Sequence, residues 1–312
     1  MEKIKEFINY SNNISPEEYA NQVHIKSELV LKKILDHKNI INFRNNQLSY
    51  YSGSLSHPDQ FAGYWFSRGI LRNYLSSLFF LILHKKNLKK FLKKLKLKYY
   101  ECNENHIGNP IIYNFLFFKE TGTNVTNCFY YSIFKKYLDQ IKPKKILEIG
   151  GGFGKLASII LSQNSDIKYN LVELPYSSVT AYYYLSEFCK NRTSEDVEFY
   201  FDLKQEFEDK KKISVFSNNY IKKNENIFKD YDLLINTESF MHMSENEINF
   251  YINLIKNNKI KFVIALNRLK KKREGETEFN KIFTKNKINL IEKIDLGDVL
   301  QDMHLTFYEN NN

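Results

Sequence analysis

A single stretch, residues 144–157, constrains the fold more than any other part of the sequence. It reads KKILEIGGGFGKLA: a short apolar run, four glycines within five positions, and then residues that favour helix. An apolar run of this length, bounded by glycine, is typical of a parallel strand covered on both faces. Glycines carry no Cβ, so the backbone can turn sharply and approach a ligand closely. The stretch therefore predicts a strand, a ligand-binding loop and a helix in an open α/β sheet.

Three kinds of nucleotide-binding loop are compared with this stretch. A Walker A loop is excluded, because Ile149 stands where its first glycine belongs and Leu156 where its hydroxyl belongs. The dinucleotide pattern G-x-G-x-x-G/A fits residues 152–157, and the S-adenosylmethionine (SAM) pattern, acidic-x-G-x-G-x-G, fits residues 148–154. Glu148 favours SAM, because a carboxylate suits a cationic cofactor better than a pyrophosphate. The predicted cofactor-binding residues of the loop are Glu148, Gly150, Gly152 and Gly154.

A second acidic residue follows at the spacing that a nucleoside site needs. Residues 168–174 read as the second strand, and Glu173 lies near its end. A carboxylate about 20 residues after the glycine loop can bind the ribose hydroxyls of an adenosine. This holds for SAM and for NAD alike, so Glu173 predicts a nucleoside cofactor without choosing between them.

Composition narrows the class of protein. The chain has 312 residues, which is longer than one typical domain. Hydrophobic residues make up 43% of it, which is enough for a sizeable core. The formal net charge of +10 is compatible with an anionic substrate, a membrane surface or nucleic acid, and equally with a general excess of lysine. No RNA-binding motif accompanies the lysines, so nucleic acid is not expected as a partner.

The cysteines and the first residues of the chain indicate the cellular compartment in which the protein is expected. Three widely spaced cysteines, Cys102, Cys128 and Cys189, offer neither a disulfide framework nor a zinc spacing. The first residues lack the apolar core of a signal peptide, and the apolar run 75–83 is too short to cross a bilayer. We therefore expect a soluble cytoplasmic protein.

The chain divides into two parts. Residues 1–139 are expected to be mainly helical, with a helix start at 15–18, an aromatic segment at 61–83 and a helix at 130–140 that follows a polar loop at 121–127. This part is a candidate acceptor or lid domain, and a loop at 99–110 with Glu104, His106 and Asn109 is a candidate cover for the cofactor. Residues 85–98 place four apolar side chains on one face of a lysine-rich helix. We expect this face to pack against the protein, with contact to an anionic membrane as the less favoured interpretation.

Residues 140–312 alternate strands and helices, which predicts a Rossmann-like, doubly wound α/β domain. The expected strands are 145–149, 168–174, 231–237, 261–267, 288–294 and 304–308, with one more at either 197–201 or 213–216, and a helix at 245–257. A seven-stranded sheet with a late terminal pair suits a class I methyltransferase better than a six-stranded dinucleotide domain.

Several motifs together resemble a family of bacterial sugar O-methyltransferases, which are themselves named largely by prediction. The motifs are the glycine loop, ELP at 173–175, DLLINTESFMHM at 232–243, NHIGNP at 105–110 and ALNR at 265–268. The resemblance covers roughly residues 98–270 and implies a SAM-dependent O-methyltransferase that acts on a sugar hydroxyl, such as that of a nucleotide sugar or a surface-polysaccharide precursor. The position before the last Met is often acidic in this family, whereas here it is His242.

The end of the strand at 231–237 carries the candidate catalytic groups. A sugar hydroxyl is a weak nucleophile and benefits from a base, and histidine titrates near neutrality. His242 is the predicted base, Glu238 would orient it or bind a sugar hydroxyl, and Asn236 would line the cofactor or the acceptor. The candidate substrate-binding residues are Asn267, Arg268 and His106. No His/Asp cluster calls for a metal, although a divalent ion is compatible with this chemistry.

Two alternative functions stay open. A nicotinamide-dependent oxidoreductase is supported by residues 152–157 and Glu173 but weakened by Glu148. A methyltransferase-like scaffold subunit would be expected to have a degenerate loop, whereas this loop is intact. The sequence does not specify the sugar, the hydroxyl position or the oligomeric state.

Overall fold

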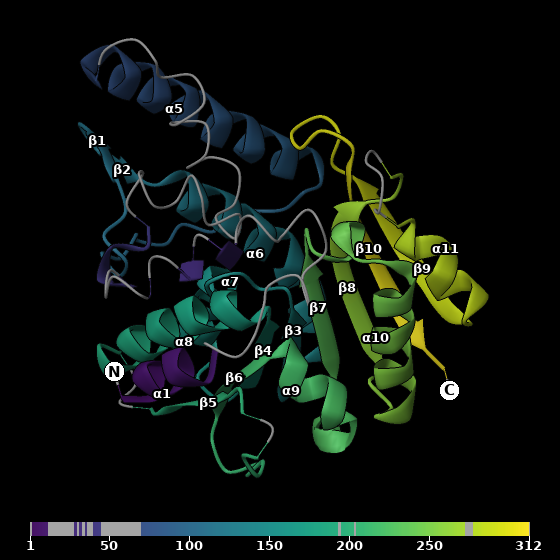
Figure 1. Cartoon of the computed structure of the whole chain (residues 1–312). Coiled ribbons are helices and arrows are strands. Elements are labelled where there is room, and N and C mark those ends of the chain that lie inside the picture. The colour runs from purple at the N-terminus through teal and green to yellow at the C-terminus, as the bar shows by residue number, and fades with distance from the viewer. Residues whose placement is uncertain are drawn as a thin grey trace.

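The computed structural model describes residues 2–11, 28–29, 31–32, 35, 40–44, 70–192, 195–202, 204–271 and 277–311. Within this part of the chain, a central sheet lies between helical layers, and a long helix extends across one end of the molecule (Figure 1). The predicted helix start at 15–18 and residues 61–69 of the aromatic segment lie outside the described residues, so the predictions for these residues stay untested, whereas residues 70–83 are helical.

The central sheet has the order β5-β6-β4-β3-β7-β8-β10-β9. All neighbouring strands are parallel except β10, which runs antiparallel to both β8 and β9. The sheet is therefore Rossmann-like and doubly wound, as predicted, with one antiparallel strand near one edge. The strands are β3 (Lys145–Ile149), β4 (Lys168–Glu173), β5 (Val197–Tyr200), β6 (Ile213–Ser217), β7 (Leu233–Thr237), β8 (Phe262–Arg268), β9 (Ile288–Asp295) and β10 (Met303–Asn310).

The strand count differs from the prediction, because the sheet has eight strands and not seven. The two β-prone runs that the sequence offered as alternatives for one strand are both strands, and they pair in parallel as β5 and β6. β5 is retained at the edge because its Phe199 is fully buried, stacked on Tyr182 and in contact with Phe7. The other predicted strands are confirmed to within two residues at their ends.

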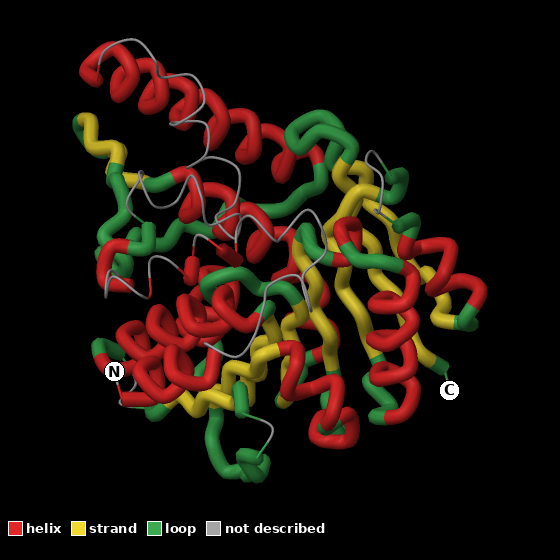
Figure 2. Tube along the Cα trace, in the orientation of Figure 1, coloured by secondary structure: helices red, strands yellow, loops and turns green. Residues whose placement is uncertain are grey.

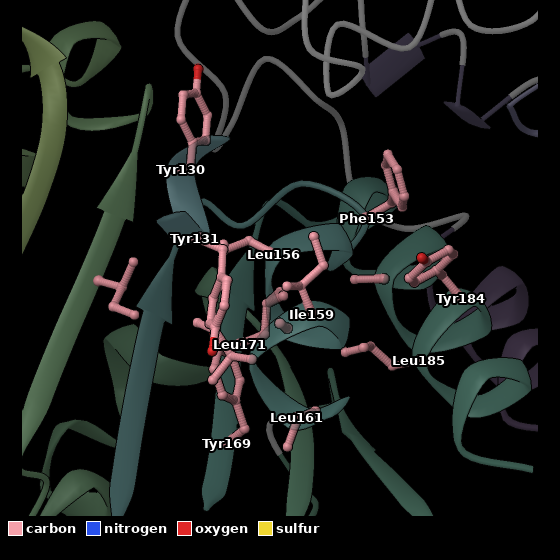
Figure 3. Close-up of a cluster of buried hydrophobic side chains, with 14 of the residues drawn as sticks. Tyr130, Tyr131, Phe153, Leu156, Ile159, Leu161, Tyr169, Leu171, Tyr184 and Leu185 are labelled. Carbon is pink, nitrogen blue, oxygen red and sulfur yellow. The ribbon is translucent and has the colours of Figure 1, made fainter. Parts of the chain in front are cut away.

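Alternate residues of each central strand face two separate cores. Ile146 lies in one apolar cluster and its neighbour Leu147 in the other, as expected for a parallel strand covered on both faces. Figure 3 shows part of the first cluster, which includes Leu156 and Leu171. Helices α6 (Gly122–Ile141), α7 (Lys155–Gln163) and α8 (Pro175–Lys190) contribute to the first core, and α9 (Asn218–Lys223), α10 (Glu245–Asn257) and α11 (Phe279–Lys285) to the second.

The N-terminal region packs on the first of these helical layers. Helix α1 (Glu2–Ser11) places Phe7 edge-on against Tyr176 of α8, with 5.5 Å between ring centroids. Helix α5 (Ile70–Lys94) packs on α6 and buries Leu88 and Leu92 completely. The apolar face of 85–98 therefore packs against the protein, as expected. A hairpin of β1 (Tyr113–Phe115) and β2 (Phe118–Glu120) was not predicted.

The predicted polar loop at 121–127 is wrong, because these residues form the first turns of α6 (Figure 2). Thr121 is the N-cap, and its hydroxyl accepts a 3.0 Å hydrogen bond from the Asn124 backbone N–H. The Asn124 side chain donates to the Cys102 carbonyl at 2.8 Å and to the Glu120 carboxylate at 2.6 Å. Polar residues are accommodated inside this helix because residues from neighbouring segments satisfy them.

Candidate functional site

The glycine loop lies at the carboxyl end of β3, where the strand order reverses from β4 on one side to β7 on the other. Such a switch point is where open α/β sheets bind ligands. Gly150 has φ 72° and donates its N–H to the Val172 carbonyl of β4 at 2.8 Å. A Cβ at Gly150 would lie 2.1 Å from the Ser239 hydroxyl oxygen, so only glycine lets the loop approach the segment after β7.

Glu173 follows β4 and binds the glycine loop directly. Its Oε1 accepts the Gly152 N–H at 2.9 Å, and its Oε2 accepts the Leu174 N–H at 2.7 Å. An ionised carboxylate has about four acceptor positions, so acceptor capacity remains for further hydroxyl groups. Burial, with a smaller contribution from Glu28 and Glu148, raises the pKa of Glu173 to about 8. Glu173 thus lies against the glycine loop, and its predicted contact to the ribose of a cofactor stays a prediction.

Glu28 of the N-terminal region caps helix α8 beside Glu173. Its carboxylate accepts backbone N–H groups from Tyr176 at 2.9 Å and Ser177 at 3.0 Å, and it is fully buried. An anionic group at a helix N-terminus satisfies unpaired N–H groups and interacts favourably with the helix dipole. Sequence analysis missed Glu28, because its partners lie 148 and 149 residues away and no local pattern marks it.

Glu148 is fully buried beneath the loop that it was predicted to begin. Its Oε2 accepts the Tyr169 hydroxyl at 2.9 Å, and within the described residues Oε1 has no hydrogen-bond partner. A Cβ at Gly151 would lie 2.5 Å from the Glu148 carboxyl carbon, so the carboxyl group supports the underside of the loop. Burial raises the pKa of Glu148 to about 7, against the opposing effect of the Tyr169 hydrogen bond.

Asn236 and Asn267 form a buried amide pair across β7 and β8. The Asn267 amide donates to Asn236 Oδ1 at 2.8 Å, and the Asn236 amide donates to the Ile149 carbonyl at 2.7 Å. Asn236 Oδ1 also accepts the Phe240 N–H, and Asn267 Oδ1 accepts the Met241 N–H. Both side chains are completely buried. The pair thus fixes the short helix η4 (Phe240–His242) on the sheet, and the predicted ligand contacts of both residues stay predictions.

The predicted catalytic residues lie at the end of β7. Glu238 has a left-handed backbone with φ 57°, a conformation that costs a non-glycine residue about 1 kcal/mol or more and that clusters at functional sites. Its carboxylate accepts a hydrogen bond from the Tyr130 hydroxyl of α6. Burial and the Glu238 charge raise the pKa of Tyr130 well above its ordinary value. His242 ends η4 and is partly buried, and its backbone N–H donates to the Ser239 carbonyl at 3.0 Å.

A buried ionic cluster, Arg44, Glu104 and Lys155, joins the N-terminal region to the glycine loop. Glu104 accepts from Arg44 and from Lys155 at 2.8 Å each, and from the Thr121 hydroxyl. The three charged side chains are at most 4% exposed. Burial would raise the pKa of Glu104, but the two cations outweigh it and hold this pKa well below its usual range. The Arg44 guanidinium also lies 4.9 Å from the ring centre of Phe153 in the loop.

Lys155 is the first residue of α7, so this cluster positions the helix that follows the glycine loop. The sequence singled out Glu104 as a candidate cover of the cofactor, whereas its two cationic partners lie 60 and 51 residues away and were missed. The loop at 99–110 is therefore connected to the residue after the glycine loop by the ion pair between Glu104 and Lys155.

Two of the predicted substrate-binding residues lie at the surface or at a strand end. His106 is exposed and lines a hollow with Tyr183 and Arg192 of the C-terminal half of α8 and the turn after it. Arg268 ends β8, and its Nε lies 3.3 Å from the Met241 sulfur, which places the guanidinium beside η4. Arg268 is thus close to the segment that carries His242, and His106 faces a different element.

The described residues show neither a metal cluster nor a membrane-spanning helix. No group of three or more His, Cys, Asp or Glu side chains in this part of the chain is arranged to hold a metal ion. Among the same residues, no helix is long and apolar enough to span a bilayer.

Comparisons with known proteins give no family assignment. No protein-family model matches the chain, and no curated protein matches its sequence. Among solved structures, it is similar to a provisionally assigned O-methyltransferase from Nostoc punctiforme, with 11% identity, a TM-score of 0.42 and coverage of 60% of each chain. It is also similar to the methyltransferase domain of a bacterial CtHen1, with 17% identity, a TM-score of 0.41 and coverage of 58% of this chain and 97% of that domain.

A third similar structure is the mitomycin 7-O-methyltransferase MmcR, with 13% identity, a TM-score of 0.39 and coverage of 61% of this chain and 57% of that one. The chain therefore spans about 60% of the length of the first of these structures. At such identities the likeness is one of backbone fold and carries no information on the substrate.

Proposed function

We propose that the chain is a SAM-dependent methyltransferase that acts on a hydroxyl oxygen of a sugar. The main support is a concentration of carboxyl groups around the glycine loop. Glu148 lies beneath the loop and Glu173 binds its Gly152 N–H, and burial raises both pKa values to near neutrality. Glu28 adds a third carboxyl group close enough to raise the pKa of Glu173 further. A cationic cofactor is suited to such a site.

The same carboxyl groups argue against the nicotinamide alternative. A dinucleotide brings a pyrophosphate to the glycine loop, where cations and helix N–H groups normally bind it. The cation nearest the loop in sequence, Lys155, is buried in an ion pair with Glu104. A pyrophosphate here would face Glu173 and Glu148, while Lys155 pairs with Glu104.

The residues present fit SAM. The positive φ angles of Gly150, Gly152 and Gly154 open the loop, and the remaining acceptor capacity of Glu173 suits the two ribose hydroxyls. The buried Oε1 of Glu148 supplies a further acceptor beneath the loop. SAM bound there supplies the methyl group, and the protein residues have to place and deprotonate the acceptor hydroxyl.

In this proposal His242 takes the proton of the acceptor hydroxyl as that oxygen attacks. Glu238, held by Tyr130, binds a neighbouring sugar hydroxyl or orients His242. Arg268, beside η4, would bind an anionic acceptor such as a nucleotide sugar, and the Asn236–Asn267 pair keeps η4 in place.

The cofactor is tested by calorimetric titration of the protein with SAM, its demethylated product and NAD. We expect SAM and its product to bind, and Glu173→Gln to weaken binding by about tenfold or more, since hydrogen bonds to a charged group are lost. Glu187→Gln is the matched control, because Glu187 lies on α8 and pairs with Lys190 at the surface. Binding of NAD alone would refute the proposal.

The acceptor is tested by mass spectrometry of nucleotide sugars incubated with the protein and SAM. We expect a gain of one methyl group, which His242→Ala removes while the calorimetric affinity for SAM is retained. Unchanged turnover in His242→Ala would show that another group is the base. Cofactor binding without methylation of any sugar acceptor would favour the scaffold alternative.

A further inference from the structure

The surface formed by the outer face of α5 and the tip of the β1–β2 hairpin is unlike the rest of the described surface. Helix α5 exposes Leu75, Phe79 and Leu83, with Phe79 64% exposed. The hairpin tip, Leu116-Phe117, exposes both side chains almost completely, at 79% and 103%. Large exposed apolar groups that cluster mark an interaction site, whereas single ones need no explanation. We call this surface the α5–hairpin surface.

The two parts of this surface lie side by side. Helix α5 packs against β1, and the hairpin runs along the N-terminal half of α5 at the same end of the molecule (Figures 1 and 2). Lys85 joins them, since its ammonium group lies 2.7 Å from a carboxylate oxygen of Glu120 and 5.7 Å from the ring centre of Phe118. The exposed apolar groups of α5 and of the tip are thus carried by one packed unit.

The hairpin tip contradicts two rules of local stability. Two-residue hairpin turns favour Asn or Gly where φ is positive, yet this one has Leu116 at φ 52°. The exposed Phe117 gains nothing from burial in the folded chain. Local rules broken without a compensating contact are expected where function requires them.

The outer face of α5 changes from apolar to basic along its length. Residues 75, 79, 83, 86, 90 and 93 follow one another at spacings of three or four, so they form one stripe on the helix. The first three are the exposed apolar residues, and the last three are exposed lysines. Residues 70–98 contain no acidic residue, and within the described part of the chain Lys86, Lys90 and Lys93 form no ion pair.

We propose that the α5–hairpin surface docks the protein on an anionic lipid bilayer. The apolar tip and the apolar end of the stripe would enter the region between headgroups and acyl chains, and the lysines would face the anionic headgroups. The charge pattern favours a bilayer over a second copy of the chain, because two such basic stripes would repel each other. The apolar face of 85–98, which is buried against the protein, takes no part. This inference does not depend on the identity of the cofactor.

The test is co-sedimentation of the full chain with vesicles of phosphatidylcholine, with and without phosphatidylglycerol. We expect binding only to the anionic vesicles, weakened by salt. The double variant Leu116→Asn, Phe117→Ser should lower binding by about tenfold or more, the factor that burial of one such side chain is worth. Asn suits the positive φ at this turn, so the variant is expected to fold. Ile291→Ser is the matched control, because Ile291 is 51% exposed on β9.

A second pair of variants tests the charge. Lys86→Glu with Lys90→Glu should abolish binding to the anionic vesicles, whereas Lys222→Glu with Lys223→Glu, on the exposed end of α9, should leave it unchanged. The proposal is overturned if the unmodified chain does not sediment with anionic vesicles, or if the hairpin variant binds as well as the control. Self-association that the hairpin variant removes, without vesicle binding, would instead identify a contact between copies of the chain.

Discussion

Replacement of Glu104 by glutamine tests the buried ionic cluster most directly. Arg44, Glu104 and Lys155 are at most 4% exposed, and Glu104 contacts both cations at 2.8 Å. Glutamine keeps the shape of the side chain but removes its charge, which leaves two buried cations without an anion. Breaking a buried ion pair by removing one partner costs about 3–5 kcal/mol. With a typical total stability of about 5–15 kcal/mol, the loss should be readily measured.

The assay is urea unfolding of the variant beside that of the intact chain. Glu101→Gln is the matched control: Glu101 also pairs with two cations, Lys85 and Lys89, but its side chain is 53% exposed. Water screens this control pair, so its loss should cost less than about 1 kcal/mol. If Glu104→Gln costs no more than Glu101→Gln, the cluster does not stabilise the fold as argued.

The pH dependence of stability gives a second readout of the same cluster. The pKa of Glu104 in the folded state lies well below its ordinary value, since Lys155 and Arg44 outweigh the effect of burial. Its contribution to stability is therefore complete above the unfolded pKa of about 4.3 and is lost as the pH falls towards the folded pKa. The free energy of unfolding of the intact chain should fall more steeply below about pH 5 than that of Glu104→Gln. Parallel pH profiles would contradict this assignment.

Three further predictions concern the glycine loop and the segment after β7. Gly150→Ala would place a Cβ 2.1 Å from the Ser239 hydroxyl oxygen, so this variant should abolish SAM binding in calorimetry. Gly297→Ala is the control: Gly297 has no positive φ, so this variant should bind SAM as the intact chain does. Glu148 has its pKa raised to about 7, so its contribution to stability is present below its unfolded pKa and is lost as the pH rises through 7. Glu148→Gln should then match the intact chain below about pH 4, where this carboxyl group is protonated in the folded and the unfolded state, and exceed it at pH 9 by on the order of 3 kcal/mol in urea unfolding. Equal stabilities at both pH values would refute this. Asn267→Ala leaves the Met241 N–H without its acceptor, which should cost about 1–3 kcal/mol of stability in urea unfolding. The variant should lower the rate of methyl transfer more than the affinity for SAM. An equal loss of rate and affinity would contradict a role of Asn267 in positioning η4.

The parts of the fold that could be predicted from the sequence are those marked by a pattern within a short stretch of residues. The strand β3, the glycine loop and α7 follow one another within residues 145–163, and each has its own pattern of apolar residues or glycines. The distance from the loop to Glu173 is also fixed by one strand and one helix. The same reasoning failed at 121–127, because the polar side chains that suggested a loop are satisfied by Glu120 and by the Cys102 carbonyl in the folded chain.

Long-range partners explain what sequence could not predict at the site. Arg44 reaches Glu104 across 60 residues and Glu28 reaches the start of α8 across 148 residues, and no periodicity marks either pairing. Asn236 and Asn267 were expected to face a ligand because each lies at the end of a strand. Neighbouring strands of the sheet bring them together, and each satisfies the other and the backbone of η4.

The glutamates near the loop show why residue type alone does not define a role. Glu104 faces two buried cations, which keep its pKa low and the side chain ionised. Burial is the largest influence on Glu148 and Glu173 and raises their pKa values to about 7 and 8. Ionising these two carboxyl groups at neutral pH therefore costs free energy, which a bound cation would offset. A cofactor that carries a sulfonium and an ammonium group would bring such charge to the loop. Glu104 is paired with cationic side chains of the protein itself, whereas Glu148 and Glu173 are suited to a cation that a bound cofactor supplies.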